Sequence, residues 1–118
     1  MSNLDRWEAG YRKGFAKPTI LQILLDEGES YPYKLTKQIP KRTQGMLTMA
    51  SSNIYPILKE LKDEGLIRVT EEKERKVMYG LTKEGQSFLT ELQESLTEFL
   101  NIMLANFSNE IKRMKEDE

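Results

Sequence analysis

The segment "SSNIYPILKELK", residues 51–62, carries side chains that could make specific hydrogen bonds and ion pairs. Ser52, Asn53 and Tyr55 stand near its start, and Lys59 and Lys62 follow. Hydroxyl and amide groups of this kind can approach base edges in DNA, and lysines can bind phosphate oxygens. A structural reading stays open, in which Tyr55 only packs at the start of a helix and the two lysines are solvated surface charges.

The chain lacks the residues that most catalytic and metal sites use. Its 118 residues include no cysteine and no histidine. Disulfides and thiolate nucleophiles are therefore excluded, and so are the commonest general base and the commonest transition-metal ligand. No pair of carboxylates stands in an apolar setting. We therefore predict a protein that is not an enzyme and that needs no cofactor and no metal.

The net charge of −1 conceals an uneven distribution along the chain. Residues 30–80 contain ten Lys or Arg against six Asp or Glu, a local charge of +4, whereas residues 81–118 contain four against eight, a local charge of −4. A polyanion at close range responds to the regional charge rather than to the total. The middle of the chain is therefore the part predicted to contact DNA.

The segment with the candidate contact residues has a helical pattern. Ile54, Leu58 and Leu61, with Ile57, recur at spacings that place them on one buried face. We expect Ser52 to be the N-cap, which puts Pro56 in the first turn, where its missing N–H costs no hydrogen bond. Gly65 is expected to end this helix.

Two further helices are expected before this segment. Pro18 suits the first turn of a helix that is apolar nearly all round and stops at Gly28. Pro32 opens a second helix, and Pro40 is expected to end it nearby. Residues 41–50 have no clear period and are predicted to form a connection.

A β-hairpin is expected after the third helix. "LIRVTE" and "RKVMYGL" have strand patterns, and the charged stretch "EEKE" between them is predicted to be the turn. Lys73, Arg75 and Lys76 are the candidates for phosphate contact from this hairpin. Positive charge is added on and after the second helix by Lys34, Lys37, Lys41 and Arg42. A solvated turn without any role in DNA binding is the alternative.

Both ends of the chain carry helical patterns with one apolar face. Residues 4–15 repeat apolar side chains at spacings of three and four, and a second pattern runs from Thr82 to about Lys115, which would make a helix of roughly 50 Å. A domain of this size cannot cover such a helix, so we expect the helix to pack on a second copy of the chain rather than fold back. The predicted dimer-interface residues are Leu92, Leu96, Phe99, Met103, Phe107 and Ile111. Trp7, in the first pattern, either packs structurally or lines a ligand cavity.

The predicted order is helix, helix, helix, hairpin, which is the order of a winged helix-turn-helix. The expected fold is mainly α with a small β-hairpin. The expected domains are an N-terminal arm helix at residues 1–17, a winged helix-turn-helix at residues 18–82, and a long C-terminal dimerisation helix at residues 83–118.

Three segments of the sequence resemble the signature blocks of PadR-type transcriptional regulators. They are "LLDEGESYPYKL", "SSNIYPILKELKDEGLI" and "RKVMYGLTKEG", and the resemblance covers about residues 18–90. This chain has Tyr31-Pro32 where the family usually has His-Gly, and Ser52 where glycine is common. The resemblance implies a dimeric winged-helix repressor whose C-terminal helices form the dimer. It also implies that a small-molecule effector is possible.

These observations predict a cytoplasmic, sequence-specific regulator that binds double-stranded DNA as a homodimer at a partly palindromic operator and represses transcription. No apolar run approaches the ~20 residues that span a membrane, so no membrane partner is expected. Two alternatives stay open. One is a winged-helix module that binds other proteins instead of DNA, and the other is a ligand-responsive regulator with a cavity near Trp7.

Overall fold

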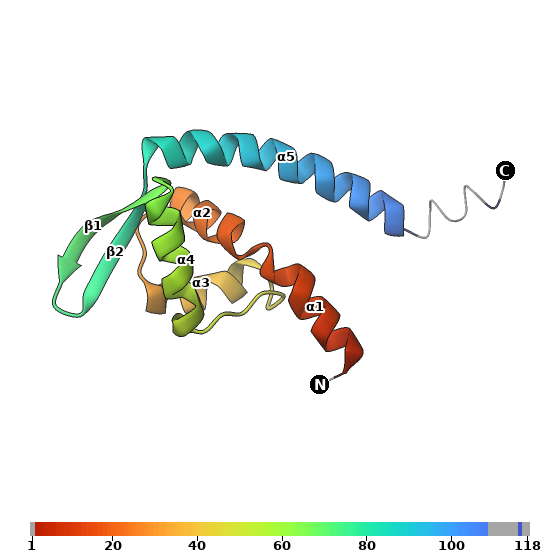
Figure 1. Cartoon of the computed structure of the whole chain (residues 1–118), viewed down its shortest axis with the longest axis horizontal. Coiled ribbons are helices and arrows are strands. Elements are labelled where there is room, and N and C mark those ends of the chain that lie inside the picture. Colours follow the sequence, from red (N-terminus) through yellow and green to blue (C-terminus); the bar gives the residue numbers. More distant parts are fainter. Residues whose placement is uncertain (1, 109–115, 117–118) are drawn as a thin grey trace.

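The computed structural model describes residues 2–108 and residue 116. The elements are α1 (Asn3–Lys13), α2 (Ala16–Glu27), α3 (Pro32–Arg42), α4 (Ser51–Asp63), β1 (Ile67–Lys73), β2 (Lys76–Leu81) and α5 (Lys83–Phe107). This order confirms the predicted winged helix-turn-helix. Helices α2, α3 and α4 cluster beside a two-stranded hairpin, and α1 and α5 extend away from this cluster (Figure 1). The hairpin formed by β1 and β2 is called the wing below.

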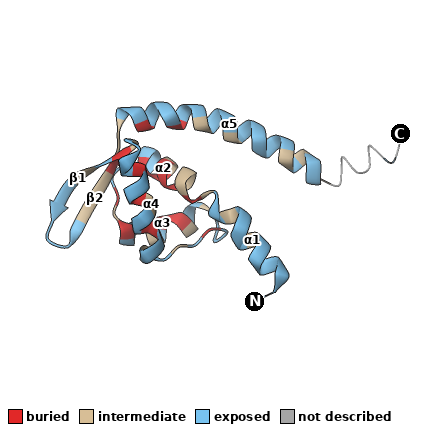
Figure 2. Cartoon of the chain, in the orientation of Figure 1, coloured by how far each residue is buried: buried red, intermediate tan, exposed pale blue. Residues whose placement is uncertain are grey.

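The helix α2 lies at the centre of the hydrophobic core because it is apolar on most of its surface. Ile20, Leu21 and Ile23 are almost completely buried, and α2 contacts α3, α5 and β2. Pro18 occupies the first turn and Gly28, with φ +87°, follows the last residue, as the sequence predicts. Figure 2 shows buried residues on α2, α3, α4 and the first turns of α5.

The wing is tied to the helices through a short bridge. Ser30 and Tyr79 exchange two backbone hydrogen bonds, of 3.0 and 2.8 Å, which adds a third chain segment beside the antiparallel pair β1–β2. Ser30 is fully buried, and its hydroxyl donates to the side-chain oxygen of Gln38 at 2.6 Å. The base of the wing is therefore fixed relative to α3.

The start of α5 is locked to the end of α4 by Thr82 and Gly85. The Thr82 hydroxyl donates to the carbonyl of Gly65 at 2.6 Å and accepts from the N–H of Gly85 at 2.9 Å. A Cβ atom at Gly85 would lie 2.0 Å from the carbonyl oxygen of Leu66. Only glycine fits at this position, so the final glycine of the "YGLTKEG" segment is required because any larger residue would overlap the Leu66 carbonyl.

The predicted start of α4 is wrong by two residues. Ala50, not Ser52, is the N-cap, because its carbonyl accepts from the N–H groups of Asn53 and Ile54 at 3.0 and 3.2 Å. Pro56 is therefore the sixth helical residue, and the bond it would donate to the Ser52 carbonyl is lost. Ser52 and Pro56 are both exposed, so the freed carbonyl lies where water can reach it.

The helix α3 ends near Pro40, as predicted, although it continues for two residues to Arg42, so the connection begins at Thr43 instead of residue 41. Thr43 caps α3 through backbone and hydroxyl bonds to the Ile39 carbonyl at 3.1 and 2.8 Å. The wing turn is shorter than "EEKE", because β1 extends to Lys73, which pairs with Lys76. Strand pairing continues through these charged residues because their side chains are exposed.

The described part of α5 ends at Phe107, where Ser108 adopts an extended conformation as the C-cap. At ~1.5 Å per residue its 25 residues span about 37 Å, less than the predicted length. The predicted contact Ile111 lies outside the described residues. Leu89 is buried in the core, and the later turns of α5 project away from the wing, as α1 does (Figure 1).

Candidate nucleic-acid interface

One face of α4 anchors the helix and the opposite face is free. Ile54, Leu58 and Leu61 are at most 1% exposed, which confirms that they lie on the buried face of the helix. Ser52, Asn53 and the predicted cationic positions along the helix are exposed. Burial of one face holds the backbone of α4 firmly, so the exposed side chains are presented from a rigid support.

The wing and the starts of α3 and α4 converge on one surface hollow. Tyr31, Pro32 and Tyr33 line it from α3, Tyr55 from α4, and residues 72–77 from the wing. We call this hollow the wing groove. It brings the sequence-predicted residues Tyr55, Lys73, Arg75 and Lys76 together, although α4 and the wing tip are separated in sequence.

The cationic side chains predicted to contact phosphate differ in their interactions with neighbouring residues. Lys59 pairs with Asp63 at 3.5 Å, and Lys73 pairs with Glu71 at 2.9 Å. Lys34, Lys62 and Arg75 are exposed side chains. Exposed pairs contribute only about 0–1 kcal/mol, so Lys59 and Lys73 can exchange their carboxylate partner for a phosphate at small cost.

Two cations of this surface lie over aromatic rings. The ammonium of Lys76 is 4.2 Å from the ring centroid of Tyr31, and that of Lys37 is 5.2 Å from the ring centroid of Tyr33. Lys37 was predicted from sequence to add positive charge to this surface, whereas Tyr31 and Tyr33 were not among the predicted candidates. The available signal was the pair of tyrosines that flanks Pro32, next to the start of a helix.

Two exposed ion pairs with perturbed ionisation connect the helices of the helix-turn-helix. Hydrogen bonds from Gln22 and Arg42 hold the pKa of Asp26 below its usual value, although the carboxylate is exposed. A hydrogen bond to Glu60, 2.7 Å away, raises the pKa of Lys17. These contacts connect α2 to α3 and α2 to α4.

Tyr79 is a half-buried residue of β2 that does not line the wing groove. Burial raises the pKa of the Tyr79 hydroxyl, and the nearby Tyr55 and Glu72 raise it further. Tyr79 therefore stays neutral across the physiological range, and it adds no negative charge beside the groove.

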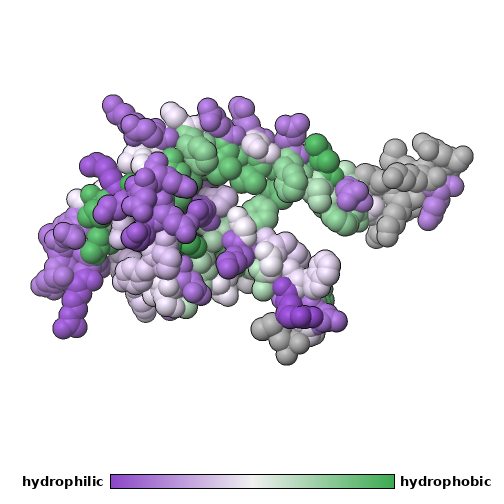
Figure 3. Space-filling model, viewed as in Figure 1, coloured by the Kyte–Doolittle hydropathy of each residue, from purple (hydrophilic) through white to green (hydrophobic). Residues whose placement is uncertain are grey.

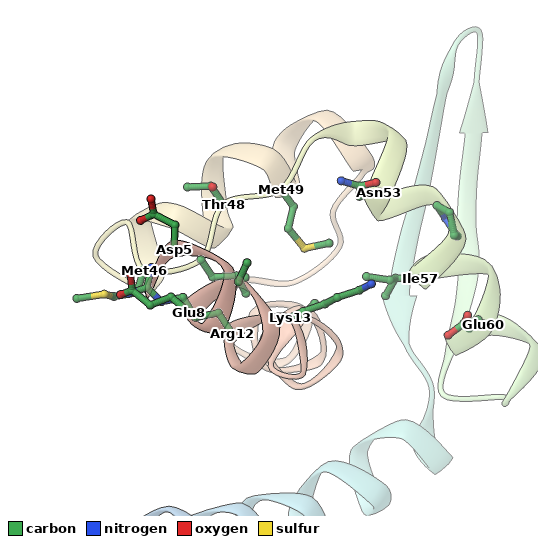
Figure 4. Close-up of a pocket in the computed structure, with 14 residues that line it drawn as sticks. Asp5, Glu8, Arg12, Lys13, Met46, Thr48, Met49, Asn53, Ile57 and Glu60 are labelled. Atoms are coloured by element: carbon green, nitrogen blue, oxygen red, sulfur yellow. The ribbon is translucent and has the colours of Figure 1, made fainter. Parts of the chain in front are cut away.

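A second hollow, of about 710 Å³, lies between α1, the loop at residues 46–49 and α4 (Figure 4). Arg12, Lys13 and Glu8 line it from α1, and Asn53 lines it from α4. Trp7 is not among its lining residues and is 75% exposed. The predicted ligand role of Trp7 therefore gains no support from this hollow and stays a prediction.

Large apolar side chains are exposed along α1 and the later turns of α5. Figure 3 shows hydrophobic residues along α5. Of the predicted interface, Leu92, Leu96 and Met103 are half-buried, whereas Phe99 and Phe107 are 53% and 72% exposed. On α1, Leu4, Trp7 and Tyr11 are also exposed, and only Phe15, just after the helix, is half-buried.

No described helix is both long and apolar enough to cross a bilayer. No group of three or more Asp, Glu, His or Cys side chains among the described residues is placed to hold a metal ion.

Comparison with known proteins gives consistent matches. The family model described as "Transcriptional regulator PadR-like family" matches residues 20–91. The "Transcriptional regulator YqjI" of Escherichia coli K12 is 36% identical over 77 residues, which is 65% of this chain and 37% of the relative. The chain thus spans a little over a third of the length of this curated relative.

Solved structures also match. PadR of Bacillus subtilis in complex with operator DNA is 34% identical, with a TM-score of 0.55 over 65% of this chain and 45% of that chain. A PadR family transcriptional regulator from Eggerthella lenta is 17% identical, with a TM-score of 0.76 over 90% and 93% of the two chains. The second likeness shows the shared fold.

Proposed function

The chain belongs to the PadR-like family, whose members are transcriptional regulators rather than enzymes, and on that premise we propose that it binds duplex DNA sequence-specifically. The observation that carries this proposal is the wing groove, where the starts of α3 and α4 meet the wing on one surface. The B. subtilis relative in complex with operator DNA supports the proposal.

We assign the reading of bases to the start of α4. Asn53 can form a bidentate pair with an adenine edge, and Ser52 can hydrogen bond to several bases. Tyr55 can contact a phosphate or a thymine methyl group. Lys59 and Lys62, farther along the same helix, contact the phosphate backbone in this proposal.

Phosphate contacts position the protein along the duplex. In this proposal Lys73, Arg75 and Lys76 supply them from the wing, and Lys34 supplies one from α3. Lysine and arginine contacts to phosphate release counterions and add affinity without sequence preference. In this proposal, sequence specificity therefore comes from the base contacts of α4, and the phosphate contacts of the wing set the position of the protein along the duplex.

The functional unit in this proposal is a homodimer that represses by occupying its operator. In this proposal residues 18–82 form the DNA-binding domain, α1 is the N-terminal arm helix, and α5 is the dimerisation helix. The exposed apolar side chains of α1 and α5 support a partner for these helices. A two-fold dimer implies a partly palindromic site, with half-sites one helical turn, ~34 Å, apart.

The surface composition favours DNA over a protein partner at α4. The large hydrophobic side chains that are exposed in the wing groove are Tyr33 and Tyr55, which carry hydroxyl groups. The exposed leucine, isoleucine and phenylalanine side chains lie mainly on α5. A protein-interaction module would place its apolar patch around α4 instead.

Enrichment of bound duplexes from a random library tests this proposal. The full chain should select a motif with two-fold symmetry, and placing that motif at a promoter should lower reporter expression when the protein is present. Substitution of Ser52 and Asn53 by alanine in the same protein serves as the control and should abolish the motif. Recovery of no motif by the unsubstituted protein would contradict sequence-specific binding.

A further inference from the structure

The segment that precedes α3 contacts the second strand of the wing at two points. Ser30 pairs with Tyr79 through two backbone hydrogen bonds. The ring of the next residue, Tyr31, lies 4.2 Å from the ammonium of Lys76, near the wing tip. The first contact fixes the base of the wing, and the second fixes a cation at the edge of the wing groove.

The charges in the wing groove make Lys76 different from its neighbours. The groove contains Lys73, Arg75 and Lys76 together with the carboxylates Glu72 and Glu74. Lys73 is paired with Glu71 at 2.9 Å and would have to leave that carboxylate before it bound a phosphate. Lys76 instead rests on an aromatic face, which attracts the cation without occupying its N–H donors.

The other tyrosines of the groove supply neutral hydrogen-bonding groups. Tyr33 and Tyr55 are 62% and 56% exposed, and both line the wing groove. Tyrosine hydroxyls donate to phosphate oxygens at protein–DNA contacts. A groove with an excess of cations, lined by hydroxyl donors, is complementary to a phosphodiester strand.

We propose that the wing groove receives one phosphodiester strand of the bound duplex, and that Tyr31 is the positioning residue that holds Lys76 toward that strand. This inference rests on the proposed DNA-binding function and adds a residue to it. Tyr31 acts through Lys76. Its removal should therefore matter only while Lys76 is present.

A double-mutant cycle tests the proposal. The affinity of the full chain for its enriched duplex is measured by fluorescence anisotropy across a salt series for the unsubstituted protein, Tyr31→Leu, Lys76→Ala and the double variant. Lys76→Ala should weaken binding and reduce the salt slope by about one. Tyr31→Leu should weaken binding about two- to fivefold, the range of a cation–π contact at an exposed site, and should add no loss in the double variant.

The outcomes separate this inference from the proposed function. Unchanged affinity in Tyr31→Leu, or a full additional loss in the double variant, would overturn the role of Tyr31 while DNA binding stood. Unchanged affinity and slope in Lys76→Ala would overturn the groove as the strand's path. Failure of the unsubstituted protein to bind any duplex would overturn both proposals.

A second measurement needs no DNA and guards against misfolding of Tyr31→Leu. The ring of Tyr31 should shift the NMR signals of the Lys76 ε-methylene protons upfield in the free protein. Tyr31→Phe keeps the ring and should recover both this shift and the affinity that Tyr31→Leu loses. Unshifted Lys76 signals in the unsubstituted protein would contradict the contact.

Discussion

Asn53 is the residue from which we expect the most base discrimination. It is exposed in the first turn of α4, and its amide can pair with both groups that adenine presents in the major groove. Replacement of Asn53 by alanine should cost about 1–3 kcal/mol of discrimination against the wrong base pair. Non-specific affinity should change much less.

The ratio of specific to non-specific affinity is the measurement for Asn53→Ala, with both duplexes titrated at the same salt concentration. A ratio equal to that of the unsubstituted protein would show that Asn53 reads no base. Asn53 also lines the hollow beside α1, so thermal unfolding should confirm that the variant is folded.

Arg75 makes a different kind of prediction because phosphate contacts carry no sequence information. Arg75→Ala should weaken binding to all duplexes alike and reduce the slope of log K against log salt by about one. Arg6→Ala is the matched control, since Arg6 is exposed on α1, away from the wing (Figure 1). An unchanged slope in Arg75→Ala would remove Arg75 from the phosphate contacts.

At the level of secondary-structure elements, substitution of Gly85 tests how closely the start of α5 packs against Leu66. A side chain there would overlap the Leu66 carbonyl, so Gly85→Ala should lower the free energy of unfolding by about 1–3 kcal/mol, as overpacking does. Gly10→Ala is the control, because nothing lies within 4 Å of its added Cβ in the exposed helix α1. It should stabilise α1 by roughly 0.5–1 kcal/mol.

Urea denaturation of the two glycine variants decides this prediction. We expect Gly85→Ala to lower the free energy of unfolding and Gly10→Ala to raise it. Both substitutions add one methyl group, and they differ only in the space around that group. A Gly85→Ala protein as stable as the unsubstituted chain would show that the start of α5 can move away from Leu66.

The elements were largely predictable, because periodicity and helix-stop residues act locally. The starts of α2 and α3 were predicted correctly from Pro18 and Pro32, and the end of α2 was predicted correctly from Gly28. The start of α4 was missed because Ala50, which has no capping side chain, is the N-cap. The extent of β1 was missed because strand pairing continues through exposed charged residues.

The site was only partly predictable from sequence. The candidates on α4 followed from a helical pattern within one segment. Tyr31 and Lys76 are in contact although they are 45 positions apart in the sequence. Their contact depends on the backbone bridge between Ser30 and Tyr79, which no local sequence pattern predicts. Contacts of this kind arise from tertiary packing, so residue types alone do not reveal them.

At the scale of the whole molecule, the exposed apolar side chains of α5 predict self-association. Phe99→Glu should weaken the dimer about tenfold or more, because burial of such a side chain contributes about 1.5–3 kcal/mol. Asn101→Glu is the charge-matched control, since Asn101 shares a helix face with Glu94 and Glu98. Sedimentation across a concentration series measures both, and an unchanged equilibrium in Phe99→Glu would place the interface elsewhere.

Recognition of a particular duplex through α4 and the wing is the property on which the other DNA-binding predictions depend. Fluorescence anisotropy of the purified protein measures it, with DNA from its own upstream region and an unrelated duplex at two salt concentrations. We expect tight binding that prefers the upstream fragment and weakens steeply as salt rises. Absence of binding to either duplex at low salt would contradict it.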